Sequence, residues 1–205
     1  MTAIWGLLLS AGFTLFLANV ARNWGKTIEP KLWDSWGGAP TTQLLRHSGP
    51  ANPVLRERWH KNLSKILGKP LPTPEEEQRD PTAADAVYEA ATRLLIGRTR
   101  DRKIYPFVYR DNVNYGFCRN LYALRSLAIS IALLGLVASA GAGYWCLRAG
   151  AISYSAWACV GICSALLLWW VFAVSSDWVS VPAMNYAHHL FEATENPSRV
   201  GSSNA

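Results

Sequence analysis

The sequence predicts an all-α integral membrane protein with three transmembrane helices and a small cytoplasmic helical domain. Residues 127–147 and 154–175 are runs of 21 and 22 residues without a charged side chain. About 20 apolar residues cross the hydrocarbon layer as a helix, and single spans of this length must be helical because backbone amides in lipid need internal partners. The six residues between the runs hold one charge, Arg148, which predicts a tight hairpin.

A third charge-free run, residues 3–21, lies at the start of the sequence. It is longer than the apolar core of a usual signal peptide, and no Lys or Arg precedes it. We therefore interpret residues 1–21 as a retained first transmembrane helix. A signal peptide is the alternative for this run, and a buried hairpin in a soluble protein is the alternative for the other two.

The distribution of positive charge predicts the orientation. Residues 22–126 hold 18 of the 20 Lys and Arg residues, so the positive-inside rule places this segment in the cytoplasm. The N-terminus and the 148–153 turn are then outside, and the tail, residues 176–205, is cytoplasmic. The predicted location is the inner (plasma) membrane, which the chain crosses several times.

Aromatic residues are expected to form a belt at each membrane surface, where amphipathic rings gather. The expected outer belt is Trp5, Tyr144, Trp145, Tyr154 and Trp157; the expected inner belt is Trp24, Trp169, Trp170 and Trp178.

Small residues recur at every fourth position on the first two predicted spans. Such stripes let helices approach closely in lipid, so we expect the first span to pack against the second. Lining of a pore by Ser10 and Thr14 is the alternative. The residues are Gly6, Ser10 and Thr14 on the first span and Gly135, Ser139 and Gly143 on the second.

The cytoplasmic segment, residues 22–126, has clear helix-start signals. Asn52, Thr73 and Asp80 each precede a Pro, a pattern typical of an N-cap followed by Pro at the first helical position. Gly68 and Gly97 are expected to end two of these helices. Residues 33–36 predict a short helix that ends at Gly37 and Gly38.

The two segments that flank the predicted hairpin are also expected to be helical. Residues 104–125 predict a helix that bends near Gly116 and runs directly into the second span. An amphipathic piece of the tail is predicted to lie flat on the membrane with its apolar residues facing the lipid, and the chain from Asn196 onward is predicted to be disordered. Those apolar residues are Met184, Ala187, Leu190 and Phe191.

No catalytic motif is present: the sequence contains neither a phosphate-binding glycine loop nor a metalloprotease or serine-hydrolase signature. We predict no catalytic residue, metal or cofactor. His47 and His60 are expected to be isolated on helix surfaces, and His188 and His189 to diverge on one helix. No ionisable side chain lies inside a predicted span, which argues against a proton relay, and a pore would need several copies of the chain.

The most function-like feature is a basic run between the helical domain and the second span. Arg guanidinium groups suit phosphate, so the run is a candidate site for a ligand or for lipid phosphate. Attraction to anionic lipid headgroups alone, worth about 1 kcal/mol per charge near the surface, is the alternative; a nucleotide, another phosphorylated signal or nucleic acid is a further one. The candidate residues are Arg98, Arg100, Arg102, Lys103, Arg110, Asn112, Tyr115 and Arg119.

Two segments, residues 36–42 (WGGAPTT) and 110–117 (RDNVNYGF), resemble those of uncharacterised small integral-membrane proteins of bacteria. The resemblance covers the cytoplasmic part and its junction with the second span, and it implies a bacterial origin. The layout is also similar to that of membrane effectors of bacterial antiphage defence, in which a soluble domain senses a signal and the spans damage the membrane.

Three function classes follow from these patterns. The first is a binding or effector protein whose cytoplasmic domain receives a ligand or partner and whose spans respond, as a homo-oligomeric pore or with a membrane partner protein. The second is a non-enzymatic scaffold or accessory subunit of a larger membrane complex. The third, a membrane enzyme, has the least support because catalytic motifs are missing.

Overall fold

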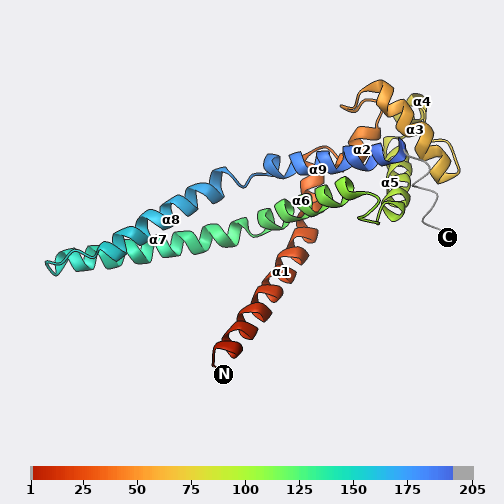
Figure 1. The fold of residues 1–205 in the computed structure, drawn as a ribbon. Helices are drawn as coiled ribbons and strands as arrows, with labels where there is room; N and C mark the ends of the chain where they lie inside the picture. The colour runs from red at the N-terminus through yellow and green to blue at the C-terminus, as the bar shows by residue number, and fades with distance from the viewer. Residues whose placement is uncertain (1, 196–205) are drawn as a thin grey trace. The chain divides into compact units, whose positions relative to one another are not determined.

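The structure is a computed structural model that describes residues 2–195 of the 205-residue chain, without the side chains of residues 2–11 and 13. Within that range every element is helical and no strand occurs, which confirms the all-α prediction (Figure 1). The predicted disorder from Asn196 onward lies outside the described residues. The elements are α1 (Thr2–Ser35), α2 (Pro40–Leu45), α3 (Pro53–Leu67), α4 (Pro74–Arg79), α5 (Pro81–Arg98), α6 (Pro106–Ala123), α7 (Arg125–Arg148), α8 (Tyr154–Phe172), α9 (Ser176–Glu192) and η1 (Ala193–Glu195).

The described residues form two compact units. We call the first, residues 2–28 and 118–179, the hairpin unit, and the second, residues 29–117 and 180–195, the helical domain. Each unit is therefore built from two separate stretches of the chain, and residues after the hairpin complete the helical domain.

In the hairpin unit, α7 and α8 lie side by side and antiparallel (Figure 1). Both are long and apolar enough to cross a membrane. Only 11% of the most apolar window of α7 and 6% of that of α8 is buried, whereas the core helix of a soluble protein would be mostly covered. The turn between them contains Gly150, whose φ of 76° is a left-handed conformation that suits glycine.

The small residues of α7 allow α8 to come close. A Cβ atom on Gly135 would lie 3.0 Å from Cys163 Sγ, and one on Gly143 would lie 3.3 Å from the Trp157 ring. In the described part of the chain these two glycines therefore pack against α8, and their predicted contact with the first span stays a prediction. Thr14 is exposed, and the side chains of Gly6 and Ser10 lie outside the described residues, so their packing stays a prediction.

The third charge-free run is the start of a longer helix, because α1 continues through Pro30 to Ser35. Its last turn replaces the short separate helix predicted over residues 33–36. The predicted glycine turn is confirmed: Gly37 and Gly38 have φ values of 84° and 130°. A first membrane span within α1 stays a prediction.

The second predicted span of the hairpin is shorter than expected. α8 ends at Phe172, and Ser175 accepts a hydrogen bond from the Trp178 amide at 3.1 Å. A side chain that accepts from an amide three residues on is the geometry of an N-cap. Ser175 therefore starts a new helix, α9, instead of continuing the span.

The core of the helical domain is built from α3, α5 and α9. Its largest fully buried side chains include Trp59 and Leu63 of α3, Tyr88 of α5 and Phe191 of α9. The prediction that the apolar face of α9 lies on the membrane is wrong. Ala187, Leu190 and Phe191 are completely buried in this core, and Met184 packs against it.

The predicted helix starts are confirmed by their caps. Asn52 accepts from the Val54 amide at 2.9 Å, and Asp80 accepts from the Ala83 amide at 3.0 Å. Thr73 forms a reciprocal capping box with Glu76. Gly68 ends α3 with a φ of 76°, but Gly97 does not end α5, which includes Arg98.

The junction between α6 and α7 differs from the prediction in one detail. The helix continues through Gly116, and Leu124 is the single residue that separates α6 from α7. No flexible linker intervenes, as the sequence predicts.

Candidate ligand site on the helical domain

The turn between α5 and α6 exposes four cations within six residues. We call Arg98, Arg100, Arg102 and Lys103 the basic turn; all four are exposed. The acidic side chain in this stretch, Asp101, accepts a hydrogen bond from the Lys103 amide at 2.8 Å. In the part of the chain that the structure describes, no carboxylate forms an ion pair with the basic turn, so its charges are available to an anion.

The other predicted ligand residues separate into two groups. Arg110 and Asn112 are exposed, and the Arg110 guanidinium carbon lies 5.2 Å from the centre of the Phe107 ring. Tyr115 is buried and Arg119 is partly buried, and both contact other residues of this chain. The eight predicted residues therefore do not form one site.

Tyr115 holds the end of α1 against α6. It is buried, its hydroxyl donates to Glu29 Oε1 at 2.7 Å, and it accepts from Trp33 Nε1–H at 3.2 Å. We therefore correct its predicted role as a ligand contact: its hydroxyl is already part of an internal network.

Arg119 lies half-buried beside a tight contact in the hairpin unit. A Cβ atom on Gly25 would lie 2.0 Å from Asn120 Oδ1 and 3.2 Å from Arg119 Nε. A larger residue at position 25 would therefore require the Asn120 side chain to move.

A pocket of about 270 Å³ opens next to the basic turn. Its walls come from the start of α6 and the end of α9, so two segments distant in sequence form it. The segment that lines it begins at Ile104, the residue after Lys103. The lining residues are Ile104, Tyr105, Pro106, Phe107, Val108, His189, Glu192 and Ala193.

An aspartate–histidine pair orients the polar side of this pocket. Asp111 is buried, and its Oδ2 pairs with His189 Nδ1. His189 Nε2 lies 3.9 Å from Glu192 Oε2, too far for a direct hydrogen bond. The His189 and Phe107 rings stack with their centres 5.9 Å apart. The pocket thus presents an imidazole nitrogen, a carboxylate and an aromatic ring.

Sequence reasoning missed Asp111, His189 and Phe107 as a group. Asp111 and His189 are 78 positions apart and lie on different helices. No local sequence pattern predicts that these two helices pack together. The one available signal was the interval of three between His189 and Glu192, which puts both side chains on one face of a helix.

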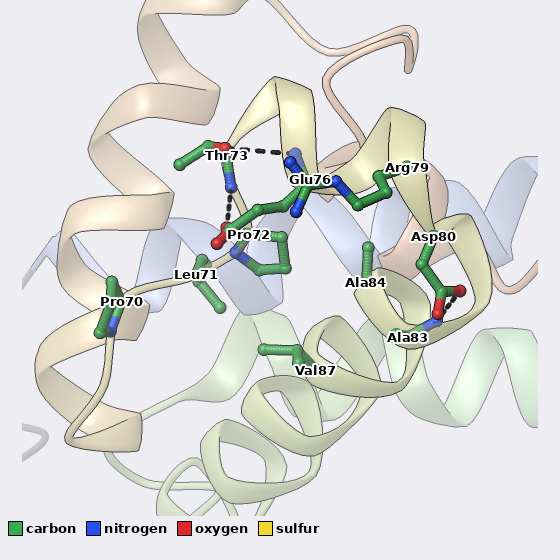
Figure 2. A pocket seen from close by; sticks show the side chains of 10 residues that line it. All are labelled: Pro70, Leu71, Pro72, Thr73, Glu76, Arg79, Asp80, Ala83, Ala84 and Val87. Carbon is green, nitrogen blue, oxygen red and sulfur yellow. Dashed lines mark hydrogen bonds between the residues drawn. The ribbon is translucent and has the colours of Figure 1, made fainter.

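A second pocket of the helical domain, about 430 Å³, is less suited to a ligand (Figure 2). Three of its polar side chains already bond to the backbone: Thr73 and Glu76 form the capping box of α4, and Asp80 caps α5. The other walls are mainly Pro, Leu, Ala and Val. Few polar groups remain to orient a bound molecule.

His47 and His60 are not isolated on helix surfaces, as the sequence had predicted. Their rings are 4.9 Å apart, and their Nε2 atoms meet the carbonyl oxygens of Pro72 and Leu45 at 3.0 and 2.7 Å. Glu77 accepts from the His47 amide at 2.9 Å and from the Tyr88 hydroxyl at 2.7 Å. These four side chains link α3, α4 and α5 to the segment after α2.

The environment of this cluster changes its ionisation. Burial lowers the pKa of His60, against the opposing effect of the Leu45 carbonyl. Burial raises the pKa of Glu77, but the hydrogen bonds from His47 and Tyr88 outweigh it and leave the pKa below its usual value. Burial and Glu77 together raise the pKa of Tyr88. The cluster is therefore held with His60 neutral and Glu77 ionised near pH 7.

The residues that the structure describes give little support for a metal site or a reactive thiol. No three His, Cys, Asp or Glu side chains within that part lie close enough to hold a metal ion. Cys118 is buried, and burial raises the pKa of its thiol, which disfavours the reactive thiolate.

A further unpredicted residue, Arg125, joins the two ends of the hairpin. Its Nε and Nη2 donate to the carbonyl oxygens of Trp170 and Val171 at 3.1 and 2.8 Å. The last carbonyls of a helix lack internal partners and carry partial negative charge. Arg125 therefore fixes the start of α7 to the end of α8.

Comparison of the chain with protein-family models, with curated proteins and with solved structures finds no match. The site's own geometry must therefore support any functional conclusion.

Proposed function

We propose that this chain is a membrane-anchored binding or effector protein, in which the helical domain receives an anionic ligand at the basic turn and the membrane helices respond. One observation supports the proposal above all others. The hairpin unit and the helical domain are continuous inside three helices: between residues 28 and 29 of α1, 117 and 118 of α6, and 179 and 180 of α9. Both α6 and α9 contribute buried side chains, such as Val108 and Leu190, to the core of the domain.

The membrane part consists of α7, α8 and a first span within α1, as the charge-free runs predict. The uncovered apolar surfaces of α7 and α8 support lipid as their surroundings, because an apolar surface of this size in water would be unfavourable. The basic segment 22–126 is cytoplasmic, the 149–153 turn is outside, and α9 returns to the cytoplasm.

Through α6, which precedes α7, and α9, which follows α8, a ligand-induced change in the helical domain can act on both membrane helices at once. A ligand shifts such an equilibrium only if it binds one state better than the other. At the same end of the hairpin, the hydrogen bonds of Arg125 hold the start of α7 to the end of α8. A movement of α6 relative to α9 would therefore act on the Arg125 contact first.

The scaffold alternative also has a structural basis. Among the described residues, no heavy atom lies within 4 Å of a Cβ added to Gly141 of α7 or Gly161 of α8, so each leaves space for another helix. A second copy of the chain and a different membrane protein would both fit this space.

A membrane-potential dye in cells that produce the full chain separates the two functions. The effector proposal expects depolarisation, which is lost when the basic turn is replaced by R98A/R100A/R102A. A matched control, R93A, removes an exposed charge of α5 that pairs with Glu89 instead. Unchanged potential with correctly inserted protein would contradict the effector proposal and favour the scaffold.

A charge-preserving substitution tests how the basic turn recognises its ligand. If geometry matters, R102K should weaken binding nearly as much as R102A, since only Arg offers a bidentate fork. If the turn only attracts anionic headgroups, R102K should bind vesicles containing 30% phosphatidylglycerol like the unmodified chain, because the charge is kept.

A further inference from the structure

We propose that the pocket between α6 and α9 binds the base of a nucleotide, whose phosphate lies against Arg110 and the basic turn. This inference rests on the proposed function, because it names the ligand class of the same site. It is argued from three features that the structure brings together: an exposed aromatic ring, two polar groups that read a heterocycle edge, and cations at the rim.

The aromatic ring is Phe107. It lines the pocket, and 59% of its surface is exposed. Bases stack on exposed aromatic side chains with favourable energy whatever their sequence identity. His189 stacks on this ring and the exposed Arg110 side chain lies over it, so a base stacks on Phe107 by taking the place of Arg110, whose guanidinium then contacts the phosphate.

The edge-reading groups are His189 and Glu192. Because Asp111 pairs with Nδ1 of His189, the orientation of the imidazole is fixed and Nε2 is the ring nitrogen left for a ligand. Glu192 offers carboxylate oxygens, which accept from the N–H groups of a base. The 3.9 Å between Nε2 and the carboxylate is too long for a bond between them, so both atoms can contact the same heterocycle.

The cations at the rim are Arg110 and Lys103. Arg110 lies over the Phe107 ring, with its guanidinium carbon 5.2 Å from the centre. Lys103 precedes Ile104, a wall residue, so its Cα lies about 3.8 Å from that of the wall. A phosphate attached to a base in the pocket would therefore be within reach of side chains that bind phosphate well.

The volume limits the ligand. About 270 Å³ is close to the lower limit of small-molecule pockets. It suits one base and part of its sugar, and it leaves the phosphate at the rim. A lipid headgroup supplies the phosphate but no ring for Phe107 and no N–H edge for Glu192.

Binding to the full chain in lipid nanodiscs tests the proposal by isothermal titration calorimetry. The probes are the four ribonucleoside 5′-monophosphates, the corresponding nucleosides and inorganic phosphate. At least one monophosphate should bind tenfold or more tighter than both its nucleoside and phosphate. F107A should weaken that binding at least tenfold, and E192Q should change the preference among bases.

A matched variant controls for general effects. Arg79 lines the other pocket, so R79A should leave nucleotide binding unchanged. Neither Phe107 nor Glu192 is buried, so both variants should fold, and circular dichroism checks this. Equal binding of nucleotide and phosphate, or unchanged binding by F107A, would overturn the inference.

A vesicle arm separates this inference from the proposed function. If full chain in nanodiscs associates with phosphatidylglycerol vesicles but binds no monophosphate better than phosphate, the nucleotide inference is wrong and the basic turn is a headgroup site. If it binds neither vesicles nor nucleotides, the proposed anionic ligand fails as well.

Discussion

The hairpin unit and the helical domain differ in how far their large apolar side chains are exposed. In the helical domain, Leu63 and Leu190 are completely buried; in the hairpin, Leu134 is 70% exposed and Phe172 is 75% exposed. The same residue types thus form a core in one unit and an outer surface in the other. Because exposed apolar surface is unfavourable in water, the difference is the one expected if the hairpin helices lie in lipid and the helical domain in water, as proposed above.

The largest expected effect is a loss of stability when a core leucine of the helical domain is truncated, compared with truncation of an exposed leucine of the hairpin. L63A creates a cavity in the core and should lower the free energy of unfolding by about 3 kcal/mol. L134A removes an exposed side chain of α7 and should change it by less than about 0.5 kcal/mol. Thermal unfolding of the detergent-solubilised full chain measures both. Equal losses would contradict the assignment of separate surroundings.

Packing inside the hairpin should be sensitive to side-chain size on one face of α7. A Cβ atom on Gly143 already lies 3.3 Å from Trp157, so G143L should force α7 and α8 apart and cost about 2 kcal/mol. G141L is the control, because nothing lies within 4 Å of a Cβ there. Trp fluorescence of the two variants reports the change around Trp157. A larger shift for G141L would mean that α8 packs on a different face.

How much of this could be predicted from sequence differs between the two units. The length of the α7 and α8 runs and their lack of charge suffice to predict these two helices, since about 20 uncharged residues are long enough to cross a membrane whatever lies beside them. The caps at Asn52, Thr73 and Asp80 were equally local and equally predictable. The apolar stripe of α9 was also visible, but an amphipathic helix can cover a membrane or a protein core, and sequence alone does not distinguish the two. That ambiguity is why its burial against Trp59 was missed.

The candidate site was predictable only in part. Four cations within six residues predicted a basic run as a candidate site, and the structure places all four at the surface. Tyr115 was misassigned because a tyrosine in a polar segment gives no sign of partners such as Glu29, 86 positions away. The Asp111–His189 pair was out of reach for the same reason, since it depends on how α6 and α9 pack.

Acid should destabilise the helical domain before it affects the hairpin. The pKa of His60 and that of Glu77 are both below their usual values in the folded chain, so the folded state binds fewer protons than the unfolded state. This stabilisation is present above about pH 6.5, the usual His pKa, and is lost as pH falls towards the folded-state values. The midpoint temperature of thermal unfolding of the unmodified chain should decrease as the pH is lowered from 7 to 4. H60Q should flatten the upper part of this dependence, and an unchanged pH profile would contradict the role of His60.

The smallest expected effect concerns two ion pairs of α5. Asp85 accepts two hydrogen bonds from Arg46, at 2.9 and 2.6 Å, in a partly covered position. Loss of this bidentate pair in D85N should cost about 1 kcal/mol. E89Q breaks an exposed pair with Arg93 and should cost about 0.3 kcal/mol. Denaturant unfolding with both variants in the same detergent makes the comparison.

The most direct test of the two-solvent account uses a native cysteine. Cys159 is exposed on the surface of α8, so it should react readily if α8 lies in water. In open membrane fragments, where both membrane faces are accessible, a charged maleimide should leave Cys159 unlabelled while it labels a cysteine introduced by V54C, an exposed position of the helical domain. Labelling of Cys159 should appear only after the membrane is dissolved and the protein unfolded. Rapid labelling of Cys159 in intact fragments, at the rate of the V54C control, would contradict the membrane assignment of the hairpin.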